Sequence, residues 1–200
     1  MDKPIVLYIH GQGGTPAEAE HYAPLFPLCD VVGLAYTAEY PWEAAEEFPR
    51  LFDALCGDRP VTLIANSIGA FFAMSALADK RIEKAYFISP VVDMQKLIGD
   101  MMAWANVSER ELLEKGTIET AFGQTLSWEY LSYVRSHPIV WQVPTHILYG
   151  SGDTLTSLET VSAFAKAVGA TLTVMENGEH WFHTEEQMRF LDRWIRSLAR

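Results

Sequence analysis

The chain has 200 residues, of which 49% are hydrophobic and 20% charged, a balance typical of a globular protein and not of a disordered one. Its formal net charge of −11 opposes binding to nucleic acid or to an anionic membrane surface, because both require clustered lysine and arginine. The sequence contains no basic run, and no stretch approaching the roughly 20 apolar residues of a membrane span.

The N-terminal residues and the cysteine content predict a cytoplasmic protein. The segment MDKPIVLYIHG lacks the long apolar core and the small-residue cleavage site of a signal peptide. Cys29 and Cys56 are the only cysteines, too few for a disulfide framework in a chain of this size. Neither has a histidine or a second cysteine at metal-ligand spacing. We therefore expect two reduced thiols and no bound metal.

Short apolar runs alternate with helical patterns along the chain. Their hydrophobicity is continuous, which indicates strands covered on both faces, as in a parallel sheet. Right-handed crossovers between such strands predict a three-layer α/β/α architecture with a doubly wound, mostly parallel sheet. The six predicted strands are Ile5–Ile9, Val31–Tyr36, Val61–Ala65, Ala85–Ser89, Thr145–Tyr149 and Thr171–Met175.

Capping pairs predict where several helices begin. The three pairs are Thr15 with Glu18, Thr156 with Glu159, and Thr184 with Gln187. Gly169 is expected to end the second of these helices. The segment Trp42–Cys56 is also predicted to be helical, and Pro49 is expected to kink or split it. The last helix has an apolar stripe that predicts packing against the sheet: Met188, Leu191, Trp194, Ile195 and Leu198.

The region Val91–Val143 departs from this alternation. Helical patterns occur at Asp93–Trp104, Ser108–Lys115 and Ser127–Ser136, without a strand of the core type. We interpret the region as a helical insertion, folded over one edge of a single domain that spans residues 1–200.

The residues that follow the strands carry the functional prediction, because ligands bind where the carboxyl ends of parallel strands meet. Ser67 follows the third predicted strand, Asp153 the fifth and His180 the sixth. A serine hydroxyl becomes nucleophilic when a base takes its proton, and imidazole does so near neutral pH. A carboxylate orients that imidazole and stabilises its protonated form. The three residues together therefore predict a Ser–His–Asp catalytic triad.

Each of these residues also has a simpler interpretation. Ser67 alone is an ordinary helix N-cap, and an aspartate after glycine commonly makes a turn. His183 is an alternative base, and Asp93, which follows the fourth predicted strand, is an alternative acid. His10 is interpreted as a structural hydrogen-bonding residue that packs under the glycine-rich loop after the first strand.

That loop, Gly11–Gly14, is predicted to supply part of an oxyanion hole. Glycines let backbone N–H groups approach a developing oxyanion closely, and the two expected donors are the N–H groups of Gln12 and Ile68. The alternative is a phosphate loop of the dinucleotide-binding type. Against this alternative, Pro16 stands where the third glycine of that motif belongs.

Four segments, HGQGG, ANSIGA, GSGDTLT and GEHW, together resemble the α/β-hydrolase superfamily, in its small-lidded bacterial branch of esterase-like serine hydrolases. The resemblance spans nearly the whole chain and implies an acyl-enzyme mechanism without a cofactor. It implies that Ser67 is the nucleophile, Asp153 the acid and His180 the base, with the oxyanion held by Gln12 and Ile68. It also places residues 91–143 where the family has its lid.

The sequence departs from the family pattern at Ala65, which stands where the Gly-x-Ser-x-Gly motif has its first glycine. It also lacks the early strands that many members have before the oxyanion loop. The leading prediction is hydrolysis of a carboxylic ester or thioester of a small to medium acyl group, a small-molecule substrate. Amide or peptide hydrolysis, acyl transfer by the same triad, and a non-catalytic binding role stay open.

Overall fold

The structure is a computed structural model that describes residues 3–198. The chain divides into two compact units, one formed by Met1–Val92 with Val140–Arg200 and the other by Asp93–Ile139. The second unit has nearly the bounds of the expected insertion. That the chain forms one domain with an insertion stays a prediction.

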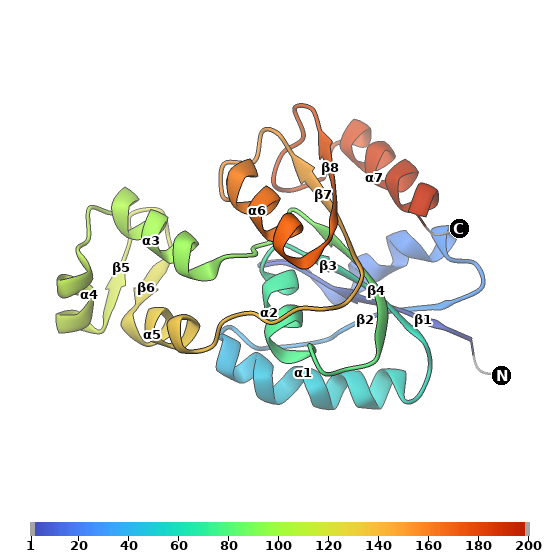
Figure 1. Ribbon diagram of the computed structural model, residues 1–200, viewed down its shortest axis with the longest axis horizontal. Coiled ribbons are helices and arrows are strands. Elements are labelled where there is room, and N and C mark those ends of the chain that lie inside the picture. Colours follow the sequence, from blue (N-terminus) through green and yellow to red (C-terminus); the bar gives the residue numbers. More distant parts are fainter. Residues whose placement is uncertain (1–2, 199–200) are drawn as a thin grey trace. The chain divides into compact units, whose positions relative to one another are not determined.

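The first unit is built on a six-stranded sheet in which every neighbouring pair is parallel (Figure 1). The strand order is β2-β1-β3-β4-β7-β8. This confirms the predicted α/β architecture with six core strands. The strands are β1 (Ile5–Ile9), β2 (Asp30–Gly33), β3 (Val61–Asn66), β4 (Ile82–Ile88), β7 (Thr145–Gly150) and β8 (Thr171–Met175).

Two strands, β2 and β4, differ from their predicted bounds by more than one residue. β2 is shorter than predicted, because after Leu34 donates to the carbonyl of Tyr8 the chain turns, with Tyr36 N–H donating to Leu34. β4 begins earlier than predicted, because Ile82 pairs with Val61 at the start of β3. Both differences reflect pairing with a neighbouring strand, which apolar runs in a sequence do not reveal.

The first unit also contains five helical segments: η1 (Pro16–Leu25), α1 (Pro41–Cys56), α2 (Ile68–Ala76), α6 (Leu158–Val168) and α7 (Glu185–Leu198). η1 is a 3₁₀-helix, and Pro24 within it has no N–H to donate. α1 runs through Pro49 as one helix, so the expected split does not occur. The buried face of α1, which includes Phe48 and Phe52, offsets the one hydrogen bond that proline removes.

The helix caps agree with the sequence in three places and differ in one. Thr15 precedes η1 and forms the predicted capping pair with Glu18. Gly169 is left-handed and ends α6 as predicted. Thr184 accepts from Gln187 N–H before α7, also as predicted. The prediction that Thr156 caps α6 is wrong, because Ser157 caps this helix by accepting from Thr160 N–H. The side chain of Thr156 instead contacts the candidate site.

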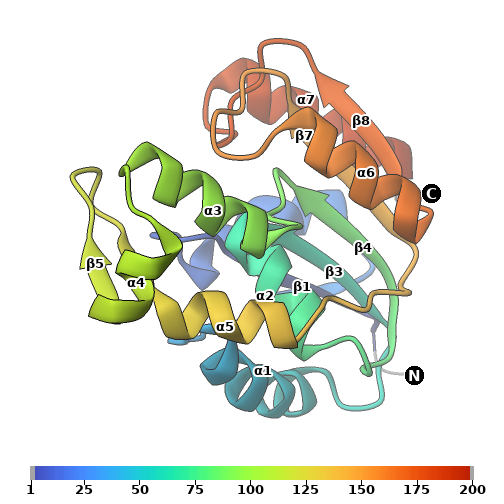
Figure 2. The same ribbon diagram turned by 60° about the vertical axis from the view of Figure 1, so that its left-hand side comes forward.

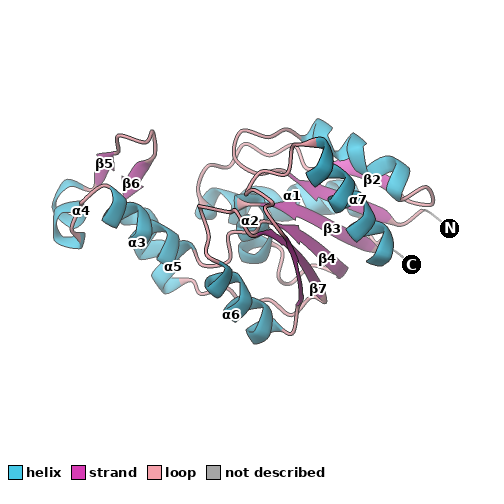
Figure 3. Ribbon diagram, turned by 90° about the horizontal axis from the view of Figure 1, so that it is seen from above, coloured by secondary structure: helices cyan, strands magenta, loops and turns pink. Residues whose placement is uncertain are grey.

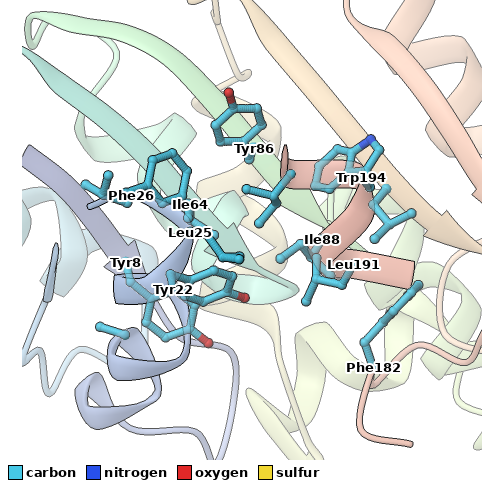
Figure 4. Packing of buried hydrophobic residues seen from close by; sticks show 14 of the residues in the cluster. Tyr8, Tyr22, Leu25, Phe26, Ile64, Tyr86, Ile88, Phe182, Leu191 and Trp194 are labelled. Carbon is cyan, nitrogen blue, oxygen red and sulfur yellow. The ribbon is translucent and has the colours of Figure 1, made fainter. Parts of the chain in front are cut away.

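The face of the sheet covered by η1 and α7 holds one hydrophobic cluster (Figure 4). Tyr8 and Ile64 of the sheet belong to it, with Tyr22 of η1. The predicted stripe of α7 packs here: Leu191, Trp194 and Ile195 are buried in the cluster, and Met188 and Leu198 are partly buried against it. Figure 3 shows α7 and α6 on opposite sides of the sheet, so helices cover both faces.

On the other face, Phe48 of α1 and Phe72 of α2 are fully buried with ring centroids 6.0 Å apart. Burying a side chain of this size stabilises the fold by roughly 1.5–3 kcal/mol relative to leaving it exposed. This packing fixes α2, and with it the junction between β3 and α2 that precedes the candidate site.

The second unit contains α3 (Met94–Trp104), α4 (Glu109–Lys115) and α5 (Trp128–Ser136), so the three predicted helices are confirmed. The unit also contains an antiparallel hairpin that was not predicted, formed by β5 (Thr117–Glu119) and β6 (Thr125–Ser127) (Figures 1 and 2). Strands of three residues are too short to produce a readable alternation of polar and apolar residues.

Within residues 3–198, no helix is both long and apolar enough to cross a bilayer. Cys29 and Cys56 are free thiols, as expected. Burial raises the pKa of Cys56 to about 11, so this thiol stays protonated and weakly reactive near neutral pH.

Candidate active site

Ser67 lies at a sharp turn between β3 and α2. Its backbone has φ 49° and ψ −122°, a conformation that costs a non-glycine residue on the order of 1–3 kcal/mol and that persists only when the surroundings enforce it. Two backbone hydrogen bonds do so: Ser67 N–H donates to Ile88 at 3.1 Å, and Val91 N–H donates to the Ser67 carbonyl at 3.1 Å. The strained turn is therefore tied to the end of β4.

The two small residues that flank this turn have different reasons to be small. A Cβ on Gly69 would lie 2.2 Å from the carbonyl oxygen of His10, so only glycine lets α2 pass this close to β1. Ala65 is fully buried within β3, paired with Ile9 and Phe87. The methyl group of Ala65 is accommodated there, and the departure from the family motif leaves the turn intact.

The structure brings the three predicted triad residues together. Ser67 Oγ lies 2.8 Å from His180 Nε2, and His180 Nδ1 lies 2.7 Å from Asp153 Oδ2. Because an ionised carboxylate only accepts hydrogen bonds, the proton of the neutral imidazole belongs on Nδ1. Nε2 then carries the lone pair and accepts the hydroxyl proton of Ser67. This is the arrangement that a general base requires.

Asp153 is held by further donors besides His180, and its side chain is fully buried. Oδ1 accepts from the N–H groups of Leu155 at 2.7 Å and Thr156 at 3.0 Å, and Oδ2 accepts from the hydroxyl of Thr156 at 3.1 Å. Burial raises the pKa of Asp153, but the hydrogen bonds from His180 and from the two backbone amides outweigh it, so that the pKa lies below its ordinary value. The carboxylate stays ionised at neutral pH and stabilises a protonated imidazole.

Close packing of two glycines brings the loops of Asp153 and His180 together. A Cβ on Gly150 would lie 2.3 Å from the carbonyl oxygen of Gly178. Gly152 N–H also donates to that carbonyl at 2.7 Å. The backbone after β7 therefore rests directly on the backbone after β8, which sets the distance between Asp153 and His180.

The predicted oxyanion donors both lie near Ser67, since Ile68 follows it and Gln12 lines the same cavity. The amide of Gln12 lies in a turn closed by Gly14 N–H donating to Gly11 at 3.1 Å, and it donates to no acceptor within residues 3–198. Ile68 is the first residue of α2, so its N–H has no partner in the helix. Both amides thus remain available, and their role as an oxyanion hole stays a prediction.

The alternative acid and base do not join this hydrogen-bonded chain. His183 Nδ1 lies 2.7 Å from the carbonyl oxygen of Trp181. Asp93 caps α3 and accepts from Lys96 N–H at 2.8 Å. The contacts that a triad requires are made by Asp153 and His180 alone among the four candidates.

His10 is buried beside the glycine loop, and its ring stacks on Tyr36 with centroids 4.3 Å apart. Its Nδ1 lies 2.9 Å from the carbonyl oxygen of Gly11, and the hydroxyl of Tyr36 donates to the carbonyl of His10. These contacts match the structural role expected for His10, at the point where β1 leads into the loop.

A second hydrogen-bonded chain near Ser67 was missed by sequence reasoning. The hydroxyl of Tyr8 donates to Glu18 Oε2 at 2.5 Å and accepts from Asn66 Nδ2 at 2.9 Å. Glu18 Oε1 also accepts from Thr15 N–H at 3.0 Å, so the capping glutamate has a further role. Asn66 precedes Ser67, and its buried Oδ1 has no donor within the described residues. The one signal in the sequence was Tyr8, a polar tip inside an otherwise apolar strand.

A cavity of about 460 Å³ opens beside Ser67 and His180. Its lining includes the glycine loop, the carboxylate-bearing Glu18, and the apolar side chains of Ile88, Leu155 and Phe182. Glu18 places a negative charge beside the loop, and the loop leads into a 3₁₀-helix instead of an α-helix. Both features are unfavourable for binding a phosphate group, which argues against the dinucleotide alternative. Among residues 3–198, no group of three histidine, cysteine, aspartate or glutamate side chains is arranged to hold a metal.

Comparison with known proteins shows the fold. No family model and no curated protein sequence matches the chain. Solved structures do match over almost all of it: α/β hydrolase domain-containing protein 10 from mouse (TM-score 0.77, 15% identity, covering 100% of this chain and 91% of that one); a putative hydrolase from Agrobacterium vitis S4 (TM-score 0.79, 16% identity, 99% and 88%); and carboxylesterase CesB from Bacillus subtilis (TM-score 0.63, 17% identity, 99% and 84%). The chain has the α/β-hydrolase fold.

Proposed function

We propose that the protein is a serine hydrolase that cleaves a carboxylic ester or thioester of a small to medium acyl group. The observation that carries this proposal is the hydrogen-bonded chain from Ser67 through His180 to Asp153, at the mouth of a cavity. The stability of the fold does not require a serine in a strained backbone conformation that faces an imidazole, or an imidazole that faces a buried carboxylate. Such strain persists where the chemistry of the site needs it.

In the proposed reaction, Ser67 Oγ attacks the carbonyl carbon while His180 Nε2 takes the hydroxyl proton. The N–H groups of Gln12 and Ile68 stabilise the oxyanion. The intermediate collapses to an acyl-serine, and His180 returns the proton to the departing alcohol or thiol. A water then attacks the acyl-serine while His180 takes its proton, and the acid leaves as His180 returns that proton to Ser67 Oγ. Asp153 stays ionised throughout and stabilises the imidazolium.

The cavity sets the size of the acyl group in this proposal. A volume of about 460 Å³ is near the lower end of the range for small-molecule sites, about 300–1,000 Å³. Ile88, Leu155 and Phe182 give it apolar walls, which favour a short hydrocarbon chain over a long or strongly polar one.

The test is hydrolysis of p-nitrophenyl esters from acetyl to dodecanoyl by the wild type, Ser67→Ala and Ser75→Ala. Ser75 lies exposed on α2, where it bonds only to the carbonyl of Phe71, and serves as the matched control. We expect Ser67→Ala to lose at least about a thousandfold in kcat and Ser75→Ala to keep wild-type activity. Undiminished hydrolysis by Ser67→Ala would overturn the proposal.

The same enzymes are assayed on matched anilides, and labelled with a fluorophosphonate probe. Labelling of Ser67 with no ester turnover would shift the assignment to an amidase or acyltransferase. Absence of both labelling and turnover would leave the fold in a binding role.

A further inference from the structure

A second cavity of about 320 Å³ adjoins the one at Ser67, and we call it the side cavity. It is lined by η1, by α7 and by the loop after His180, and it lies over Tyr8 of β1. The two cavities have five lining residues in common: Glu18, Asn66, Ile88, Trp181 and Phe182. The two cavities are therefore adjacent at these five residues.

The side cavity carries negative charge. Glu18 lines both cavities, and among residues 3–198 no lysine or arginine lines either one. Two histidines line the side cavity, and each faces a carboxylate: His21 Nε2 lies 2.8 Å from Asp192, and His183 Nδ1 lies 3.5 Å from Glu179. Both rings thus face carboxylates other than Glu18, and the charge of Glu18 remains without a lysine or arginine partner among residues 3–198.

The Glu18 carboxylate also has room for another donor. It accepts one hydrogen bond from Thr15 N–H and one from the hydroxyl of Tyr8, whereas a carboxylate offers about four lone-pair positions. The two neutral donors orient the group but do not neutralise it. A ligand that covers Glu18 without a positive charge or a donor would desolvate the carboxylate at a cost.

Aromatic rings form the other recognition element. Trp181 lines both cavities and is 71% exposed, which is unusual for a side chain of this size. Its ring stacks on His183 with centroids 4.3 Å apart and planes 17° from parallel. Tyr22 and Phe182 line the same side cavity. Aromatic faces next to a carboxylate form the kind of surface that binds an ammonium group.

We propose that the substrate carries a cationic nitrogen that occupies the side cavity, between Glu18 and Trp181, while its ester carbonyl lies at Ser67. The inference rests on the proposed hydrolase function and adds the charge class of the substrate. An anionic acyl or alcohol group is disfavoured by Glu18, and a neutral one leaves the negative charge of Glu18 without a cation. The ligand class is therefore an ester with an ammonium group in its acyl or its alcohol part.

The test uses two pairs of esters that differ only in charge. In the first pair the acyl chain of a p-nitrophenyl ester ends in trimethylammonium or in its tert-butyl isostere. In the second pair the alcohol is choline or its tert-butyl isostere, joined to one common acyl group. We expect kcat/KM to favour the cationic member of at least one pair by about tenfold. The preference falls as salt is added, because ions screen the charge on Glu18.

Three variants locate the origin of this preference. Glu18→Gln and Trp181→Leu are each expected to lower the ratio of cationic to neutral kcat/KM toward one. Glu20→Gln is the matched control, because Glu20 is exposed on the same 3₁₀-helix, lines neither cavity and changes the net charge equally. Because each variant is compared with itself on two substrates, a general loss of activity cancels from the ratio.

The outcomes separate this inference from the function on which it rests. Ser67-dependent hydrolysis of the neutral esters with no cationic preference in either pair would overturn the inference and leave the hydrolase proposal standing. An equal fall in the ratio for Glu18→Gln and Glu20→Gln would also overturn it, because net charge would then explain the preference. If none of the four esters is hydrolysed, the result counts against the hydrolase function itself.

Discussion

The two sides of Ser67 are held by different kinds of structure. On one side, the loops of Asp153 and His180 rest on each other through glycine backbones, and several donors converge on one buried carboxylate. On the other side, the loop of Gln12 also approaches the turn at Ser67 closely, because Gly69 lies against the carbonyl of His10. In addition, three side chains in series, Glu18, Tyr8 and Asn66, connect the residues after this loop to that turn. Backbone packing therefore positions both sides, but only the side of the predicted oxyanion amide also has a chain of side-chain hydrogen bonds to the residue before Ser67, which single substitutions remove.

The largest effect is expected where the buried carboxylate is replaced. Asp153→Asn keeps the shape of the side chain but can donate an amide N–H to His180 Nδ1. The imidazole proton then moves to Nε2, which can no longer accept the proton of Ser67. We expect kcat to fall about 10⁴-fold while the fold is retained, as measured on the best p-nitrophenyl ester. Asp93→Asn is the control, because Asp93 caps α3 and is not bonded to His180. Equal losses in both variants would contradict the assignment of Asp153.

The same substitution tests the lowered pKa of Asp153. Because that pKa lies below its ordinary value, the ionised carboxylate stabilises the fold above about pH 4, and this contribution is lost as pH falls through the folded-state pKa. The wild type is therefore expected to exceed Asp153→Asn in unfolding free energy at pH 7, by a margin that shrinks as pH falls below about 4. Urea unfolding at a series of pH values measures this margin, and a margin that grows toward acid pH would contradict the direction of the shift.

A smaller effect is expected where the packing of the two loops is disturbed. Gly150→Ala places a methyl group 2.3 Å from the Gly178 carbonyl oxygen, so the two loops must separate. We expect a loss of about 1–3 kcal/mol in unfolding free energy and a fall of roughly a hundredfold in kcat, because a misplacement of about 1 Å has that effect.

Gly99→Ala is the control for that variant. Gly99 lies within α3, and a Cβ there meets nothing within 4 Å, so this variant is expected to be neutral or slightly stabilised. Chemical denaturation followed by fluorescence gives both stabilities. Full activity in Gly150→Ala would show that the loops tolerate separation, and the contrast between the two sides of Ser67 would fail.

The smallest effect is expected on the other side of Ser67. Tyr8→Phe removes the hydroxyl that joins Asn66 to Glu18 and leaves the ring in the core. We expect kcat to fall about tenfold with KM nearly unchanged, because an oxyanion amide that is less well positioned affects the transition state more than the bound ester.

Tyr86→Phe is the matched control for Tyr8→Phe. The hydroxyl of Tyr86 donates to the carbonyl of Leu198 at the end of α7, so its loss is expected to lower stability slightly without changing kcat. Steady-state kinetics with the same ester separates kcat from KM. A fall in stability with unchanged kcat for Tyr8→Phe would reduce the three-residue chain to a structural role.

Part of this organisation was readable from the sequence. Continuous apolar runs predicted the parallel strands, and the polar residues after them predicted Ser67, Asp153 and His180, because the carboxyl ends of parallel strands share one edge. Thr156 was misread for an equally local reason: its spacing to Glu159 fits a helix cap, although Ser157 caps the helix and Thr156 bonds to Asp153.

Only the tertiary structure decided which side chains meet. Tyr8, Glu18 and Asn66 come from a strand, a 3₁₀-helix and the end of another strand, and no local spacing relates them. The side cavity depends on η1 and α7, which lie far apart in the chain. Local patterns predict elements because they reflect the burial of one face of a helix or strand. Hydrogen bonds between elements depend on the packing distance of whole layers, which the sequence does not express in any local pattern.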